Sequence, residues 1–178
     1  MSQDPVTIPE IEKAIRNVPD FPKPGIQFKD ITPVLADARL FAGSIDLLTE
    51  GLAPGAVDAV AGVEARGFIF AAAVALRLGA GFVPVRKQGK LPRRTVEASY
   101  SLEYGANLIA IHEDAVRPGA RVLLVDDVLA TGGTAAAAAG LLRRLGAQLV
   151  EVVFLLELSF LKGRERLRED RVRSLIQY

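Results

Sequence analysis

The chain has 178 residues, and its 22 lysines and arginines nearly balance 21 aspartates and glutamates, which leaves a net charge of +1. This length suits one compact domain with a substantial core, and the near-neutral charge disfavours a nucleic-acid-binding protein. Because the chain has no cysteine and a single histidine, disulfides, cysteine-based zinc sites and thiol nucleophiles are excluded, and a histidine-rich metal centre is disfavoured.

The hydrophobic pattern argues against a membrane protein. Half of the residues are hydrophobic, but no apolar run approaches the roughly 20 residues that a membrane-spanning helix needs. Residues 1–13 lack the basic flank and the apolar stretch of a secretory signal peptide. We therefore expect a soluble, cytoplasmic protein with neither a membrane partner nor a nucleic-acid partner.

The first 51 residues predict two helices with a proline-rich loop between them. Thr7 and Glu10 have the spacing of a capping box, and a helical apolar period follows, made by Ile11, Ala14, Ile15 and Val18. Residues 19–33 contain four prolines and a glycine, so they fit a surface loop or flap rather than a helix or a central strand. Asp37 is a suitable N-cap for a second helix that runs to about Gly51.

From residue 58 on, apolar strands alternate with helices. Helices are predicted over 67–79 and 133–146, and a polar loop over 87–95. One or two helical turns are predicted over 161–167 and an edge strand over 172–178. The other strands are predicted over 58–63, 81–86, 107–112, 121–126 and 148–157. This alternation favours an α/β fold with a parallel sheet, and because no repeat or linker interrupts it, we expect a single domain spanning 1–178.

The segment VLLVDDVLATGGT, residues 122–134, combines an acidic pair with a loop of small residues. Asp126 and Asp127 follow an apolar strand, at the end where parallel sheets bind ligands. Residues 130–134 then open a helix, whose N–H groups and dipole favour an anion. The loop lacks the lysine of a nucleotide-binding P-loop and the GxGxxG spacing, so it predicts a single terminal phosphate. Ionised aspartates accept hydrogen bonds from sugar hydroxyls, which together predicts a 5-phosphoribosyl ligand.

This segment resembles the motif by which type I phosphoribosyltransferases bind 5-phosphoribosyl 1-diphosphate (PRPP). Other segments are similar to the adenine-specific members of that family, and they cover 19–35, 63–70, 86–92, 99–105 and 156–167. The resemblance implies the type I phosphoribosyltransferase fold, an α/β fold with a central, mainly parallel, twisted sheet flanked by helices. It also implies a small N-terminal hood or flap. We expect residues 1–35 to form the N-terminal helix and base-binding flap, and residues 36–178 to form the core.

The resemblance further implies a purine salvage enzyme that transfers the 5-phosphoribosyl group of PRPP to adenine, giving AMP and pyrophosphate. It implies Mg²⁺ as cofactor, held mainly through PRPP and water with Asp126 as a candidate ligand, and it implies a homodimer. Asp126 and Asp127 would bind the ribose, and the 5-phosphate would lie against residues 130–134, which are Ala130, Thr131, Gly132, Gly133 and Thr134.

The remaining roles implied by the resemblance fall on other loops. The pyrophosphate would be bound by Arg66, Lys87 and Lys90. Similar family loops often contain a cis non-proline peptide, and a cis peptide between Glu64 and Ala65 would point to function. Residues 98–107 would form a mobile catalytic loop in which Glu103 handles the proton of the base and Tyr104 shields the reacting carbon; with Asp127 these are the catalytic residues. The adenine site would be formed by Gln27, Phe28, Lys29 and Leu158, beside Glu157.

The sequence departs from the family pattern at two positions, and two other functions remain alternatives. Many family members have a hydrophobic residue in place of Gln27 and arginine in place of Lys29, so the contacts to the purine edge differ here. Arg93 and Arg94 belong either to the surface or to a partner's site, and His112 is interpreted as structural. The alternative functions are a hypoxanthine, guanine or xanthine phosphoribosyltransferase, and a non-catalytic PRPP-sensing regulator.

Overall fold

The computed structural model describes residues 4–102 and 105–178, with side chains described outside 100–106. The chain forms two compact units that divide between Leu47 and Leu48. Among the described residues, no helix has the length and apolar character needed to cross a membrane.

The first unit contains short helices and a small sheet. Its elements are α1 (Ile8–Ala14), β1 (Arg16–Pro19), β2 (Gln27–Asp30), α2 (Thr32–Ala36) and α3 (Ala38–Leu48). The capping box is confirmed, because the Thr7 N–H donates to Glu10 Oε2 at 2.9 Å. The N-cap of α3 is confirmed as well, because the Leu40 N–H donates to Asp37 Oδ1 at 2.9 Å.

Two details of the first unit differ from the expectation. Val18 does not continue the first helix; it lies in β1 and pairs with Phe28 of β2. The helix ends because Ile15 adopts an extended conformation. Residues 19–33 avoid a central strand as predicted, but they are not all loop, since they supply β2 and the start of α2. Both differences arise because β1 and β2 form an antiparallel pair with only each other.

The second unit is built on a seven-stranded sheet with the order β5-β6-β4-β3-β7-β8-β9. Five of these strands are parallel, and β5 and β6 add antiparallel to one edge. This arrangement confirms the mainly parallel α/β fold. The strands are β3 (Ala59–Val63), β4 (Gly81–Lys87), β5 (Thr95–Leu102), β6 (Gly105–His112), β7 (Arg121–Leu129), β8 (Gln148–Glu157) and β9 (Val172–Gln177).

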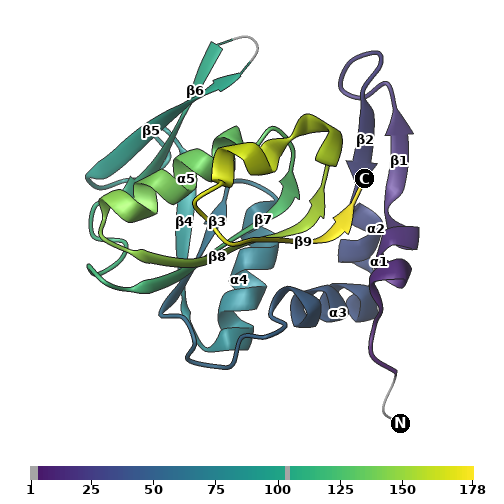
Figure 1. Cartoon of the computed structure of the whole chain (residues 1–178), viewed down its shortest axis with the longest axis horizontal. Helices are drawn as coiled ribbons and strands as arrows, with labels where there is room; N and C mark the ends of the chain where they lie inside the picture. Colours follow the sequence, from purple (N-terminus) through teal and green to yellow (C-terminus); the bar gives the residue numbers. More distant parts are fainter. Residues whose placement is uncertain (1–3, 103–104) are drawn as a thin grey trace. The chain divides into compact units, whose positions relative to one another are not determined.

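Helices α4 (Gly67–Leu78) and α5 (Gly133–Arg144) cover the two faces of this sheet (Figure 1). Side chains alternate along β3: Ala61 joins the buried core with α5, whereas a Cβ on Gly62 would lie 2.5 Å from Ala71 Cβ of α4. A strand buried on both faces must be apolar throughout, and every residue of β3 is buried. After β8 the chain forms two short 3₁₀ helices, η1 (Ser159–Leu161) and η2 (Gly163–Leu167), as the sequence predicted for that segment.

Two strands extend further than the sequence indicated. Residues 98–107 were expected to form a loop, but β5 reaches Leu102 and β6 starts at Gly105, with Ser99 paired to Leu108. Strand β7 was expected to end at Asp126, but its pairing with β8 continues to Leu129 and Glu157. Each extension depends on a neighbouring strand that the local pattern does not reveal.

Candidate active site

The candidate site lies in the second unit, where the parallel strands β3, β4 and β7 present their carboxyl ends at one edge of the sheet. A cavity of about 340 Å³ opens there. Its lining comes from several segments of the chain, the first and last of which are more than 60 positions apart. The lining residues are Val63, Glu64, Ala65, Arg66, Lys87, Ile109, Asp126, Asp127 and Thr134. The structure thus joins the predicted acidic pair to the predicted pyrophosphate residues Arg66 and Lys87.

The acidic pair lies at a gap in the sheet. Strand β3 pairs with β7 only as far as Val125, so Asp126 and Asp127 come directly after the last β7 residue that pairs with β3. Asp126 Oδ1 accepts the Asp127 N–H at 2.9 Å. A Cβ on Gly67, the first residue of α4, would come within 2.4 Å of Asp126 Oδ1. The absence of a side chain at Gly67 therefore makes room for the Asp126 carboxylate.

Burial makes these two carboxylates unusual. Asp127 is 6% exposed, and Asp126 keeps some surface toward the cavity while protein encloses its other sides. Burial, followed by the neighbouring charge of Asp127, raises the pKa of Asp126 well above its ordinary value. Burial also raises the pKa of Asp127, and the positive charge of Arg66 limits that rise. Two adjacent buried carboxyls thus repel unless a proton, a cation or a donor offsets their charge.

Arg66 supplies part of that offset. It precedes α4, and its Nε lies 2.7 Å from Asp127 Oδ2. The contact is an ion pair without the angles of a hydrogen bond. The Arg66 side chain is 39% exposed, so the guanidinium can also face a bound anion. The Glu64–Ala65 peptide before it is cis, a feature that similar family loops often have.

Glu64 organises the neighbouring loop, a role that the sequence did not indicate. Its carboxylate accepts hydrogen bonds from Arg86 Nε and Nη2 at 3.2 and 3.1 Å, and from the Lys87 N–H at 3.1 Å. The Arg86 guanidinium, and then the Lys87 N–H, lower the pKa of Glu64. Arg86 Nη1 also donates to the Lys90 carbonyl at 2.9 Å. Glu64 therefore fixes the turn that carries Lys87 and Lys90, although Lys90 itself does not line the cavity.

The predicted phosphate loop adjoins the acidic pair. A second cavity of about 80 Å³ is lined by Asp126 and residues 128–135. Gly132 has φ +77°, a left-handed conformation that favours glycine, and the Ala136 N–H donates to its carbonyl at 2.9 Å. Helix α5 thus starts at this loop, and its first N–H groups have no partner within the helix. They and the positive end of the helix dipole suit a phosphate.

The predicted adenine residues are divided between the two units. Gln27, Phe28 and Lys29 lie on β2 of the first unit; the Phe28 ring packs edge-on against Phe21, with centroids 5.0 Å apart, and Lys29 Nζ donates to Asn17 Oδ1 at 2.7 Å. Leu158 follows β8 in the second unit. Glu103 and Tyr104 lie outside the described residues.

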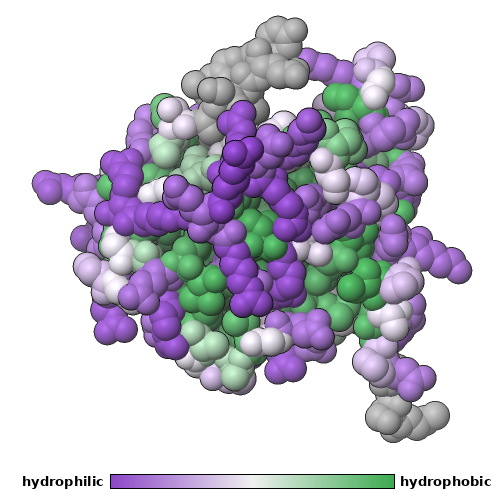
Figure 2. All heavy atoms as spheres, in the orientation of Figure 1, coloured by the Kyte–Doolittle hydropathy of each residue, from purple (hydrophilic) through white to green (hydrophobic). Residues whose placement is uncertain are grey.

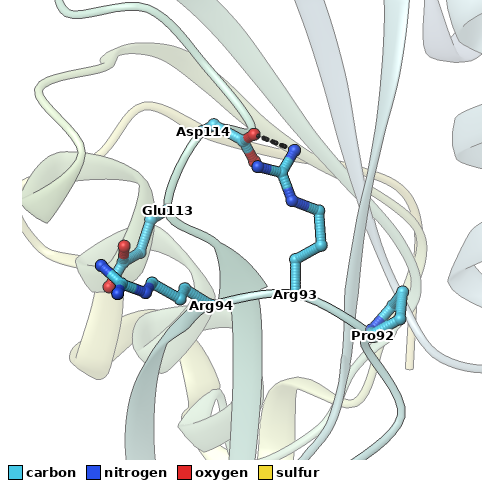
Figure 3. Close-up of a pocket in the computed structure, with 5 residues that line it drawn as sticks. All are labelled: Pro92, Arg93, Arg94, Glu113 and Asp114. Atoms are coloured by element: carbon cyan, nitrogen blue, oxygen red, sulfur yellow. Dashed lines mark hydrogen bonds and ion pairs between the residues drawn. The ribbon is translucent and has the colours of Figure 1, made fainter.

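A larger, open cavity of about 620 Å³ lies at the base of the β5–β6 hairpin, away from these residues. Figure 3 shows Arg93 and Arg94 pointing toward Asp114 and Glu113, respectively. Arg93 Nη1 is 2.8 Å from Asp114 Oδ2. Two arginines and two acids leave this cavity without a net charge, so it lacks the character of a diphosphate site. Arg93 and Arg94 are surface residues in the chain.

Comparison with known proteins identifies the family to which these features belong. The family described as a phosphoribosyl transferase domain matches residues 27–176. A relative from Acidothermus cellulolyticus, an adenine phosphoribosyltransferase, is 59% identical over 97% of this chain and 98% of its own length. The chain belongs to the adenine phosphoribosyltransferases.

Solved structures of this family agree with the fold. The adenine phosphoribosyltransferase of Thermoanaerobacter pseudethanolicus is 52% identical, with a TM-score of 0.91 over 97% of this chain and all of that one. The enzyme of Saccharomyces cerevisiae is 43% identical, with a TM-score of 0.88 over 94% of this chain and 97% of that one. That yeast structure contains adenine and an imino-altritol bisphosphate.

The raised pKa of Asp126 predicts how stability depends on pH. As pH rises above about 4, the unfolded chain loses the Asp126 proton before the folded protein does, so the folded state loses stability. We expect Asp126→Asn to raise the unfolding temperature of the ligand-free protein at pH 7, because the amide carries no buried charge while its oxygen still accepts the Asp127 N–H. At pH 3, where both states hold the proton, the difference should vanish.

Differential scanning calorimetry at the two pH values measures this, with Glu12→Gln on the exposed surface of α1 as control. A lower unfolding temperature for Asp126→Asn at pH 7 would mean that the site stabilises the ionised carboxylate.

Proposed function

We propose that this chain catalyses phosphoribosyl transfer from PRPP to adenine, yielding AMP and pyrophosphate, with the residues of the described cavity as its PRPP site. The observation that carries the proposal is the placement of a buried acidic pair between a phosphate-sized loop at a helix start and two cationic side chains, Arg66 and Lys87. PRPP has a matching order of groups: a 5-phosphate, vicinal hydroxyls and a diphosphate.

Each group of PRPP has a complementary set of donors or acceptors. Residues 130–134 bind the 5-phosphate through backbone N–H groups and the hydroxyls of Thr131 and Thr134. Asp126 and Asp127 accept hydrogen bonds from the ribose hydroxyls. Arg66, Lys87 and Lys90 neutralise the diphosphate, and Glu64 holds the loop of the two lysines in place.

The reaction breaks one bond and forms another at the same sugar carbon. Adenine N9 attacks C1 of the ribose from the face opposite the diphosphate, the C1–oxygen bond breaks, and that electron pair leaves with pyrophosphate. Positive charge develops on the sugar, and the carboxylates of Asp126 and Asp127 stabilise it from fixed positions. The N9 proton is lost, and Glu103 is our candidate acceptor, with Tyr104 excluding water from the centre.

The donor set fits a Mg²⁺ ion that reaches the site with its substrate. Within residues 4–102 and 105–178 no three His, Asp or Glu side chains gather into a metal site. Mg²⁺ commonly keeps waters and binds through substrate phosphates and one or two carboxylates. We assign its protein contact to Asp126, directly or through water. Bound there, the ion would supply positive charge that offsets the charge of the leaving diphosphate.

The adenine site combines Phe28, as a stacking platform, with backbone and polar groups of Gln27 and Lys29. Leu158, which follows β8 in the second unit, remains a predicted adenine residue. Support comes from the adenine bound in the yeast relative and from the half-buried ring of Phe28. An apolar ring beside a few polar groups is the usual composition of a small-ligand site.

A homodimer is also part of the proposal, and an apolar patch on α4 supports it. The patch consists of Ile69, Ala73 and Leu76, one face of the helix at spacings of four and three residues. Ile69 is 41% exposed and Leu76 is 85% exposed. Exposed apolar patches commonly mark protein interfaces, and a two-fold dimer buries the same patch on both subunits.

We expect sedimentation equilibrium at micromolar concentration to give twice the chain mass for the wild type. Leu76→Lys should shift it toward the chain mass, because the buried interface cannot hold two unpaired charges. Phe160→Lys, at a residue 68% exposed on η1, is the matched control and should remain dimeric. A wild-type monomer, or a dimer indifferent to Leu76→Lys, would contradict this assignment.

Substrate choice distinguishes the proposed activity from its alternatives. With PRPP and Mg²⁺, we expect the chain to convert adenine to AMP and pyrophosphate, and to give no product with hypoxanthine, guanine or xanthine. Chromatography of nucleotides formed from the four bases in parallel measures this. Product from an oxopurine alone would assign a different purine transferase, and PRPP binding without product from any base would favour the regulator.

The acidic pair should be essential to turnover. We expect Asp127→Asn to lower kcat/KM for PRPP by about 10- to 150-fold, which corresponds to losing one charge-assisted contact of about 1.5–3 kcal/mol. Asp114→Asn is the matched control, because it also removes a carboxylate from an arginine, Arg93, but outside the cavity. Steady-state kinetics on both variants measure the effect. Wild-type turnover by Asp127→Asn would remove Asp127 from the mechanism.

A further inference from the structure

The phosphate loop touches a segment that the mechanism above does not use. A Cβ on Gly132 would lie 2.3 Å from the Gly163 carbonyl oxygen, and a Cβ on Gly163 would lie 2.3 Å from the Ala130 carbonyl oxygen. Real side chains do not approach this closely, so the two backbones meet at a distance that only glycine permits. Gly163 is buried, and it begins η2.

This contact bears on the direction of the phosphate-binding N–H groups. The Ala130 carbonyl faces Gly163. In a trans peptide the carbonyl and the following N–H point in opposite directions, so the Thr131 N–H points away from Gly163. A side chain at position 163 would have to displace the Ala130 carbonyl, the Leu129 side chain or the Gly132 backbone. Each displacement would turn or shift the loop.

Segment η2 is itself tied to the sheet by an ion pair between Arg164, whose side chain is 40% exposed, and the buried Glu157. Glu157 is 4% exposed, and both of its carboxylate oxygens accept hydrogen bonds from Arg164 Nε, at 2.9 and 2.8 Å. Arg164 Nη1 also donates to the Val172 carbonyl at 2.9 Å, and Ser174 Oγ donates to Glu157 Oε2 at 2.8 Å. The residue next to Gly163 is thereby tied to β8 and β9.

The residues that precede and follow Gly163 in this segment are held in place as well. The Leu158 N–H donates to the Leu129 carbonyl at 2.9 Å, one residue before Ala130. Leu167, at the end of η2, is 2% exposed and belongs to the core. Within η2 and just before it, the exposed side chains of Lys162, Glu165 and Arg166 are hydrophilic, and the surface in this region is mostly hydrophilic in Figure 2. The inward side thus carries the glycine and the buried anchors.

We propose that Gly163, held in place by the Arg164–Glu157 pair, is a positioning residue that sets the shape of the phosphate loop and hence the affinity for the 5-phosphate. This assignment rests on the proposed function only in naming the 5-phosphate as the group bound. It also gives Glu157 a structural role, because its carboxylate is engaged by Arg164 and Ser174.

The test measures binding of ribose 5-phosphate by titration calorimetry, together with KM values for PRPP and adenine. For Gly163→Ala we expect the Kd of ribose 5-phosphate and the KM of PRPP to rise about tenfold or more, because small misplacements of a binding loop are costly. The KM of adenine should stay within about twofold, since the proposed adenine residues lie outside residues 130–134. Gly140→Ala, in α5 with no atom within 4 Å of the added Cβ, is the control and should bind as the wild type.

Thermal unfolding reports whether Gly163→Ala folds. If it folds and binds ribose 5-phosphate as the wild type does, the proposal is overturned while the phosphoribosyltransferase activity stands. If it does not fold, Arg164→Lys decides, because lysine keeps the charge but cannot bridge both oxygens. We then expect about threefold weaker binding of ribose 5-phosphate, and unchanged binding would overturn the proposal. A wild type that binds ribose 5-phosphate but makes no AMP would refute the proposed activity alone.

Discussion

The burial of two adjacent carboxylates at one strand end is the constraint on which the site depends. Asp126 and Asp127 lie where β3 stops pairing with β7, so the sheet itself opens a space for them. That space exists only because Gly67 has no side chain, and Arg66 of the same turn brings the nearest positive charge, 2.7 Å from Asp127. A single turn between β3 and α4 therefore supplies both the room and the counter-charge. The remaining repulsion makes a ligand with hydroxyl donors and developing positive charge favourable there.

Backbone rather than side-chain chemistry determines the other half of the site. The loop at 130–134 presents N–H groups at the start of α5. Unlike a long side chain, a backbone N–H group cannot extend toward a ligand, so its direction is set by the path of the backbone. Their placement therefore depends on what packs behind them. Gly132 and Gly163 bring two backbones together, and the segment carrying Gly163 is tied by Arg164 to a buried carboxylate on β8. In our proposal, the contacts among Arg164, Glu157 and Ser174 thus influence a phosphate-binding loop whose own residues are uncharged.

The sequence predicted most of the second unit because its signals are local. Fully apolar runs such as 58–63 became buried strands, and Gly79 and Gly146, both with positive φ, follow the helices they were expected to end. The predictions were wrong where the structure of a residue depends on a strand that is distant in the sequence. Leu102 and Leu129 lie in strands because β6 and β8 pair with them, and Val18 leaves the first helix for a pairing with Phe28.

The acidic pair, Arg66 and Lys87 could be predicted from motifs, whereas the roles of Glu64 and Gly67 could not. Their importance arises from contacts with Arg86 and Asp126, 22 and 59 positions away.

The charges of the site follow an order that matches the reaction. In the proposed mechanism, anionic groups of PRPP bind on both sides of a carboxylate pair that repels them, and a different kind of donor is available on each side. Neutral N–H groups face one side, at residues 130–134, and full positive charges face the other, at Arg66 and Lys87. In the proposed mechanism only the second side needs cations, because the diphosphate carries more charge and gains still more as its bond to the sugar breaks. The proposal places the fixed carboxylates between the two, next to the carbon that becomes positive. In the proposed mechanism, neutral donors therefore lie where the charge of the substrate remains constant, and cations lie where it changes during the reaction.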